Sequence, residues 1–155
     1  MNGSLIYDAN TKMQVGKKFT GTRSDEQCKG YAKNVYKMLF GIVVNSTQPW
    51  DKGLNYKLYE KEGMEIVKSY PQLTESYAKD LFSGAHPGDF VQMRRMHGGS
   101  HSAIVYSVSA TGVTFLEANA DGKMTVQKNT YTWAQLNRNN QAMTVYTATD
   151  YKIKE

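Results

Sequence analysis

The strongest constraint on the fold is a series of strand-like runs separated by very short turns. The runs cover residues 90–93, 102–109, 113–119, 124–131 and 142–148. Three-residue turns at 110–112 and 120–122, each ending in glycine, join the second run to the third and the third to the fourth. Strands joined by turns this short are antiparallel, because a parallel connection needs a crossover of a dozen or more residues. We therefore expect an antiparallel sheet of about five strands.

Helical signals precede and flank these runs. Ser24 to Gln27 fit a capping box, and the apolar positions that follow lie on one face of a helix that ends near Gly41. Shorter helices are expected at 74–82, capped by Thr74, and after a second capping pattern that starts at Thr132. Residues 45–72 show no single period and are expected to form a loop or short helices. Together these signals predict an α+β domain.

Length and charge narrow the classes of protein. The 155 residues fit one domain, with residues 1–20 expected to be an extended segment or a remnant of cloning. No apolar run reaches the 18 residues of a membrane span, and the start of the chain lacks the pattern of a secretory signal. The net charge of +5 is spread along the chain, with 12 basic against 9 acidic residues in 1–85 and 7 against 5 in 86–155. Because duplex binders concentrate basic residues on one stripe, no nucleic-acid partner is expected.

Cys28 is the only cysteine, which excludes an internal disulfide and a zinc site built from several thiolates. A lone cysteine on the apolar face of a helix is usually a small buried hydrophobic residue. Cys28, however, comes four residues after the expected cap Ser24, where unpaired N–H groups favour a thiolate. The same N–H groups can hold the oxyanion that forms when a thiolate attacks an amide carbonyl. A buried hydrophobic residue and a nucleophile both remain possible interpretations.

One of the three histidines is placed to act as a base for this thiolate. His86 lies in a Pro-Gly turn and His97 in a polar loop, so both are expected to be exposed. His101 begins a strand and shares a face with Ala103 and Val105, which are small enough for the cysteine-bearing helix to pack on them. This packing would bring the thiol towards the imidazole. The alternative is a structural histidine at the end of a strand.

Two polar residues, Glu117 and Asn119, continue the apolar face of the next strand at its end. An unpaired buried carboxylate or amide is costly, so a partner is expected. The turn at 110–112 pairs the two strands antiparallel and places His101 next to Glu117 and Asn119. Either residue can accept a hydrogen bond from the imidazole and fix its orientation and tautomer. A polar strand end that faces solvent is the alternative.

These residues belong to four segments that follow one another in order within residues 24–148, and short gaps separate the last three. The segments are Glu26-Gln27-Cys28, Pro87-Gly88-Asp89-Phe90-Val91-Gln92, Gly99-Ser100-His101-Ser102-Ala103-Ile104-Val105 and the stretch from Gly112-Val113 to Glu117-Ala118-Asn119. Their order, with cysteine opening a helix and histidine opening a strand, resembles the CHAP branch of the NlpC/P60-like cysteine amidases and peptidases.

The resemblance implies a papain-like fold, with the nucleophile helix packed on an antiparallel sheet, and hydrolysis of amide bonds in peptidoglycan. It implies that Cys28 is the nucleophile, His101 the general base and then acid, and Glu117 or Asn119 the orienting residue. Gln27 and the backbone N–H of Cys28 would lie near the oxyanion.

The resemblance also implies a bacterial protein outside the cell or at its wall. A peptidoglycan peptide or another amide is the expected partner, no metal or other cofactor is expected, and the chain is expected to be a monomer. A protein-directed cysteine protease, deamidase or transferase remains an alternative, and so does an inactive wall-binding module.

Overall fold

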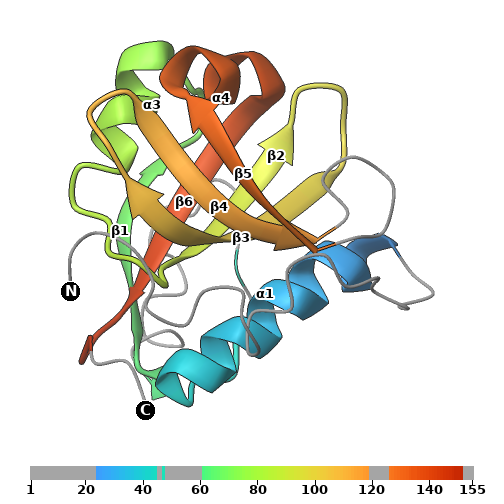
Figure 1. The fold of residues 1–155 in the computed structure, drawn as a ribbon, viewed down its shortest axis with the longest axis vertical. Coiled ribbons are helices and arrows are strands. Elements are labelled where there is room, and N and C mark those ends of the chain that lie inside the picture. The colour runs from blue at the N-terminus through green and yellow to red at the C-terminus, as the bar shows by residue number, and fades with distance from the viewer. Residues whose placement is uncertain (1–23, 45–46, 48–60, 119–125, 152–155) are drawn as a thin grey trace.

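The computed structural model describes residues 24–44, 47, 61–118 and 126–151, with the backbone alone for residues 24–28. Within this part the chain forms an antiparallel six-stranded sheet and three helices, an α+β fold (Figure 1). The elements are α1 (Ser24–Phe40), β1 (Met64–Tyr70), α3 (Glu75–Leu81), β2 (Phe90–Arg95), β3 (Ser100–Val108), β4 (Gly112–Ala118), β5 (Val126–Thr132), α4 (Trp133–Asn139) and β6 (Asn140–Ala148). The strand order is β1-β6-β2-β3-β4-β5. None of the described helices is long and apolar enough to span a membrane.

The predicted helix is present as α1 and ends where expected, but Ser24 is its first helical residue and not the cap that the sequence predicts, so Cys28 is its fifth residue. Gly41 adopts a φ of 72°, in the left-handed region that glycine enters without steric cost. Its N–H donates to the carbonyl of Lys37 at 2.7 Å, which satisfies one of the carbonyls that the last helical turn leaves unpaired.

Both short helices begin at the threonine that the sequence indicates. The Thr74 hydroxyl accepts a hydrogen bond from the N–H of Tyr77 at 3.1 Å at the start of α3. At the start of α4, the Thr132 hydroxyl accepts from the N–H of Gln135 at 3.2 Å, and the Gln135 side chain accepts from the N–H of Thr132 at 2.8 Å. This reciprocal capping box confirms the second capping pattern.

The sheet has one strand more than the sequence predicts. The expectation of a loop or short helices over 45–72 is wrong for residues 64–70, which form the edge strand β1 beside β6. Residues 45–46 and 48–60 of that range lie outside the described residues. The pairing of β1 shifts register between Ile66 and Lys68, and every β1 residue except Met64 is partly or fully exposed. A bulge on a half-exposed edge removes the alternation by which a strand is recognised.

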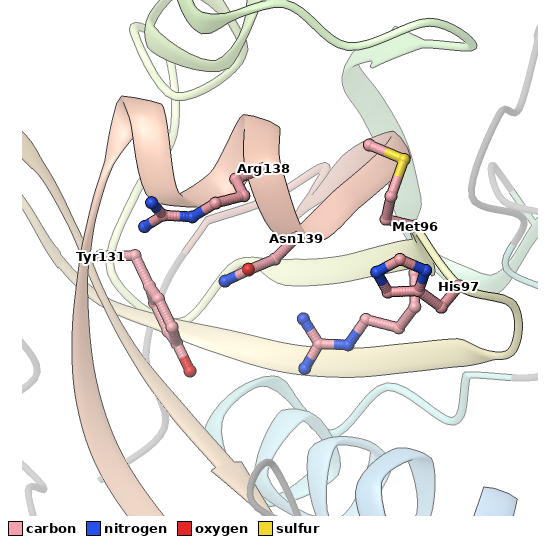
Figure 2. A pocket seen from close by; sticks show the side chains of 6 residues that line it. Met96, His97, Tyr131, Arg138 and Asn139 are labelled. Atoms are coloured by element: carbon pink, nitrogen blue, oxygen red, sulfur yellow. The ribbon is translucent and has the colours of Figure 1, made fainter.

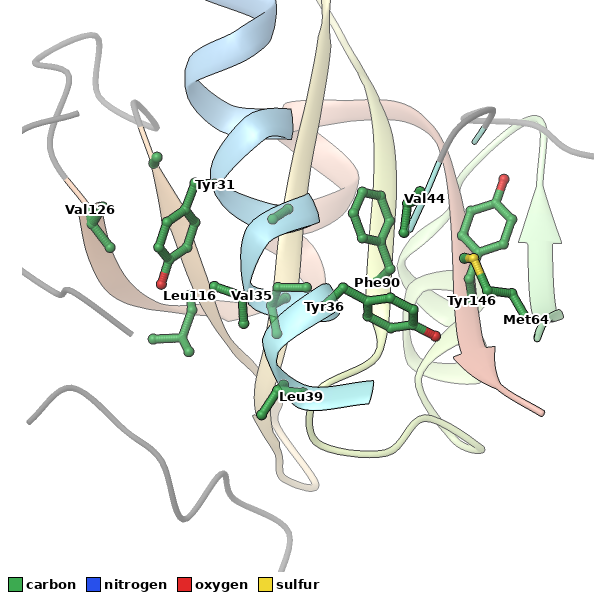
Figure 3. Packing of buried hydrophobic residues seen from close by; sticks show 13 residues of the cluster. Tyr31, Val35, Tyr36, Leu39, Val44, Met64, Phe90, Leu116, Val126 and Tyr146 are labelled. Carbon is green, nitrogen blue, oxygen red and sulfur yellow. The ribbon is translucent and has the colours of Figure 1, made fainter. Parts of the chain in front are cut away.

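The two faces of the sheet carry different helices (Figure 1). Helix α1 packs against β3 and β4, and Tyr31, Val35 and Leu39 belong to the core on that face together with Ile104 and Leu116 (Figure 3). Helices α3 and α4 lie on the other face. The second core there includes residues of both helices and of four strands, among them Leu81, Phe82, Val91, Ala103, Val105, Phe115, Leu136 and Val145.

This arrangement corrects the expected docking of α1. The sequence predicts that the cysteine-bearing helix packs on Ala103 and Val105 and so brings the thiol towards His101, but these two residues face α3 and α4. The rings of Phe82 and Trp133, stacked with centroids 6.0 Å apart, belong to the core on that face. The small side chains of Ala103 and Val105 leave space above the sheet, which the two rings fill. The larger Ile104 lies on the face that α1 covers.

The close pairing of β4 with β5 yields a test of the fold. A Cβ atom at Gly112 would lie 2.1 Å from the carbonyl oxygen of Tyr131, so Gly112→Ala must push the two strands apart. We expect a loss of about 2–3 kcal/mol in the free energy of unfolding, measured by urea denaturation. In Gly84→Ala the new Cβ would lie 3.5 Å from Val67, an ordinary contact, and the expected change is below about 0.5 kcal/mol. Equal losses in the two variants would contradict the β4–β5 register.

Candidate active site

A buried histidine–carboxylate pair lies where β3 begins and β4 ends. The Nε2 atom of His101 is 2.6 Å from Oε1 of Glu117, and the side chains are 5% and 1% exposed. The pair lies on the sheet face of Ala103 and Phe115, which α3 and α4 cover. The proximity that the turn at 110–112 predicts for His101 and Glu117 is therefore present.

The other oxygen of Glu117 is held by the neighbouring strand β5. Oε2 accepts a hydrogen bond from Nδ2 of Asn129 at 2.9 Å and another from the hydroxyl of Tyr131. Burial alone would raise the pKa of Glu117, but the hydrogen bond and charge of His101 and the bonds from Tyr131 and Asn129 hold that pKa below its ordinary value. Glu117 is therefore an ionised carboxylate at neutral pH, with both oxygens engaged.

The hydroxyl of Tyr131 remains protonated at neutral pH. Burial first, and then the negative charge of Glu117, raise the pKa of Tyr131 above its ordinary value. A protonated phenol can only donate to a carboxylate that carries no proton, so the direction of this hydrogen bond is fixed. The carboxylate in turn holds the His101 ring and its tautomer in place.

The backbone of His101 is fixed from the opposite face of the sheet. The Gln92 side chain donates to the His101 carbonyl at 3.1 Å. Its oxygen accepts from the hydroxyls of Ser102 at 3.1 Å and Thr47 at 2.7 Å. Hydrogen bonds therefore hold the start of β3 on both faces of the sheet, and they limit the positions that the imidazole can adopt.

The predicted nucleophile lies at the same end of the sheet. Cys28 and Gln27 are in the first turns of α1, and their side chains fall outside the described residues. Tyr31, three residues further on, packs in one core with Ala118 and Val126, the last residue of β4 and the first of β5 (Figure 3). Figure 1 likewise shows the start of α1 beside the end of β4.

The remaining predicted residues have different outcomes. Asn119 lies outside the described residues, and Glu117 is the acceptor that the structure places at the imidazole. His86 and His97 are exposed, as predicted. Among the described residues, no three His, Cys, Asp or Glu side chains are grouped to hold a metal ion.

Sequence reasoning missed the two β5 residues that support Glu117. Asn129 and Tyr131 alternate on one face of a run that a short turn joins to the Glu117 strand. Antiparallel pairing across that turn could have brought them beside Glu117, by the same argument that places His101 there. Tyrosine and asparagine on a half-exposed strand are so common that the sequence gives them no distinguishing mark.

Comparison with known proteins gives little. No family model and no curated protein matches the sequence. Among solved structures, the chain is similar to Ly7917, with 20% sequence identity and a TM-score of 0.37. The match covers 56% of this chain and 32% of the Ly7917 chain, so it spans about a third of that protein's length.

Proposed function

We propose that this chain is a cysteine-dependent hydrolase that cuts amide bonds in peptidoglycan, as an amidase or an endopeptidase. The observation that carries the proposal is the buried pair of His101 and Glu117, with Glu117 fixed by two further donors. An ionised carboxylate in this position orients an imidazole and stabilises the imidazolium that forms when the ring takes a proton. Cys28, in the helix that begins at this end of the sheet, supplies the group that needs such a base.

The proposed reaction proceeds through a thioester. The Cys28 thiol gives its proton to His101, and the sulfur attacks the amide carbonyl carbon. The side chain of Gln27 and the unpaired backbone N–H groups of the first turn of α1 stabilise the oxyanion. The C–N bond then breaks as His101 gives the proton to the leaving amine. Water attacks the thioester with His101 as base, which releases a carboxylic acid and regenerates the thiol.

The positions of the elements determine how the thiol would approach. Helix α1 and the His101 side chain lie on opposite faces of the sheet. His101 is the second residue of β3 and Glu117 is the last but one of β4. In the papain-like arrangement that we propose, the sulfur therefore reaches the imidazole around the ends of these two strands.

Alkylation tests the proposal directly, because a single cysteine makes the modification specific. Purified peptidoglycan should release new amino groups when it is incubated with the full chain. Pretreatment with iodoacetamide, with the addition of one group confirmed by mass spectrometry, should abolish the release. Circular dichroism shows whether the alkylated protein stays folded. If a fully alkylated, folded protein released amino groups as fast as the untreated protein, the proposal would be wrong.

The same experiment separates the alternatives. Cleavage or deamidation of proteins, with intact peptidoglycan, would identify a protein-directed enzyme. A thiol that reacts at pH 6 no faster than free cysteine, together with binding to peptidoglycan and no release, would identify an inactive wall-binding module. Hydrolysis of peptidoglycan would place the natural site of action outside a bacterial cell or at its wall.

A further inference from the structure

A pocket opens on the sheet face that carries His101 and Glu117. It has a volume of about 550 Å³ and lies between the last turn of α4, the ends of β2 and β5, and the turn after β2. Figure 2 shows Arg138, Asn139 and Tyr131 around one side of the pocket, with His97 across from them. A second hollow of about 330 Å³ continues it along β5 and shares Tyr131, Arg138 and Asn139 with it. We call the two together the α4 groove.

The α4 groove carries positive charge. Arg95 and Arg138 line the main pocket, and none of the described acidic side chains lines either hollow. Within the described part of the chain, neither arginine forms an ion pair. Arg95 donates one hydrogen bond, to Asn140 at 3.3 Å, which positions the guanidinium and leaves most of its five donors for other partners.

The groove adjoins the groups that hold Glu117. Tyr131 forms a wall of both hollows and donates its hydroxyl to Glu117. Asn129 lines the second hollow and donates to the same carboxylate oxygen. Arg95 follows Met93, which pairs with His101, by two residues in β2. A ligand in the groove therefore lies on the same side of the sheet as the imidazole.

We propose that the α4 groove binds the peptide part of the substrate and that Arg95 and Arg138 hold a carboxylate of that peptide. This inference rests on the proposed function and specifies its substrate as an acidic peptide. Two guanidinium groups match a carboxylate because each can donate two parallel hydrogen bonds. The amide side chains of Gln127 and Gln135 add polar groups to the lining of the second hollow.

Binding measurements test the site separately from catalysis. The full chain with Cys28→Ala is titrated by calorimetry with a soluble peptidoglycan stem peptide and with the same peptide after its carboxylates are converted to carboxamides. We expect the acid form to bind at least tenfold more tightly. The double variant Arg95→Gln/Arg138→Gln should lose this preference. The control Arg94→Gln, which removes the adjacent exposed arginine of β2, should keep it.

Each result decides the assignment. Equal affinity of the two peptides for the parent, or a preference retained by the double variant, overturns it. Competition by inorganic phosphate at the same potency as the peptide also overturns it, because the site would then recognise any anion. If loss of the Arg95 bond to Asn140 unfolds the double variant, Arg138→Gln alone, at an exposed position, should still weaken the preference.

The failures of the two proposals are distinguishable. If the chain does not cut peptidoglycan but still prefers the acid peptide, the proposed function fails and the carboxylate site stands. If the chain cuts peptidoglycan but binds both peptides equally, only the carboxylate site fails. In an active enzyme the double variant should raise KM for peptidoglycan fragments at least tenfold and leave kcat within threefold, because both arginines act on binding.

Discussion

Replacing His101 with glutamine is expected to lower kcat on peptidoglycan by at least about a thousandfold. Glutamine can still donate to Glu117 from its amide, so the buried carboxylate keeps a partner and the fold is retained. It cannot take the proton of the thiol or return it to the leaving amine. The measurement is the initial rate of amine release at saturating substrate, with circular dichroism to show that the variant is folded.

The same variant tests whether the imidazole contacts the thiol at the end of the sheet and raises its reactivity. In the parent, alkylation of Cys28 at pH 6 should be much faster than that of free cysteine, and His101→Gln should remove this acceleration. The control is His86→Gln, whose side chain is exposed in the turn before β2, and it should change neither rate. Unchanged alkylation in His101→Gln would show that Cys28 has no contact with the imidazole, and the proposed nucleophile–base pair would be wrong.

Replacing Glu117 with alanine is expected to lower the free energy of unfolding by about 3–5 kcal/mol at pH 7. Three donors, on His101, Asn129 and Tyr131, converge on this buried carboxylate and would all lose their acceptor. Glu117→Gln keeps the volume and one acceptor, so a loss of about 1–3 kcal/mol is expected. The exposed Glu65→Gln in β1 is the matched control, with a change below about 0.5 kcal/mol.

The stabilisation by Glu117 also depends on pH, with a defined sign. Its pKa in the folded chain lies below the ordinary value of 4.5, so the unfolded chain binds more protons as the pH falls. The contribution is complete above pH 4.5 and is lost as the pH falls through the folded pKa. Urea denaturation measures the free energy of unfolding at pH 7 and at pH 3.5. The decrease from pH 7 to pH 3.5 should be smaller for Glu117→Gln than for the parent. Equal losses would mean that folding does not lower the pKa of Glu117.

Local patterns predicted most of the elements, because the signals for these elements lie within short stretches of the chain. The caps at Thr74 and Thr132 and the glycine after α1 mark helix ends through bonds within a few residues. The proximity of His101 to Glu117 followed from a short turn, which pairs β3 and β4 antiparallel. The register shift between Val105 and Ser107, which sets the offset of the two residues, was not predicted. Strand β1 was not predicted, because its bulge and its place at the sheet edge disrupt the alternation of apolar and polar residues.

The choice of sheet face could not be predicted in the same way. Alternation shows that His101 and Ala103 share a face and that Ile104 lies on the other, but both faces of the sheet are apolar. Which helix covers which face depends on the volumes of α1, α3 and α4 together, a property of the whole core. Arg95 and Arg138 lie 43 positions apart in the sequence, and only the return of β6 beside β2 brings them to one pocket.

Asn129 and Tyr131 belong to β5, an edge strand of the sheet that pairs with β4 alone among the described strands. Detachment of such a border segment requires less free energy than opening of the central strands. When β5 peels away, Glu117 loses two of its donors at once, and water gains access to a carboxylate that was dry. The support of the His101–Glu117 pair therefore depends on an edge strand, and heating is expected to loosen this pair before the central strands separate.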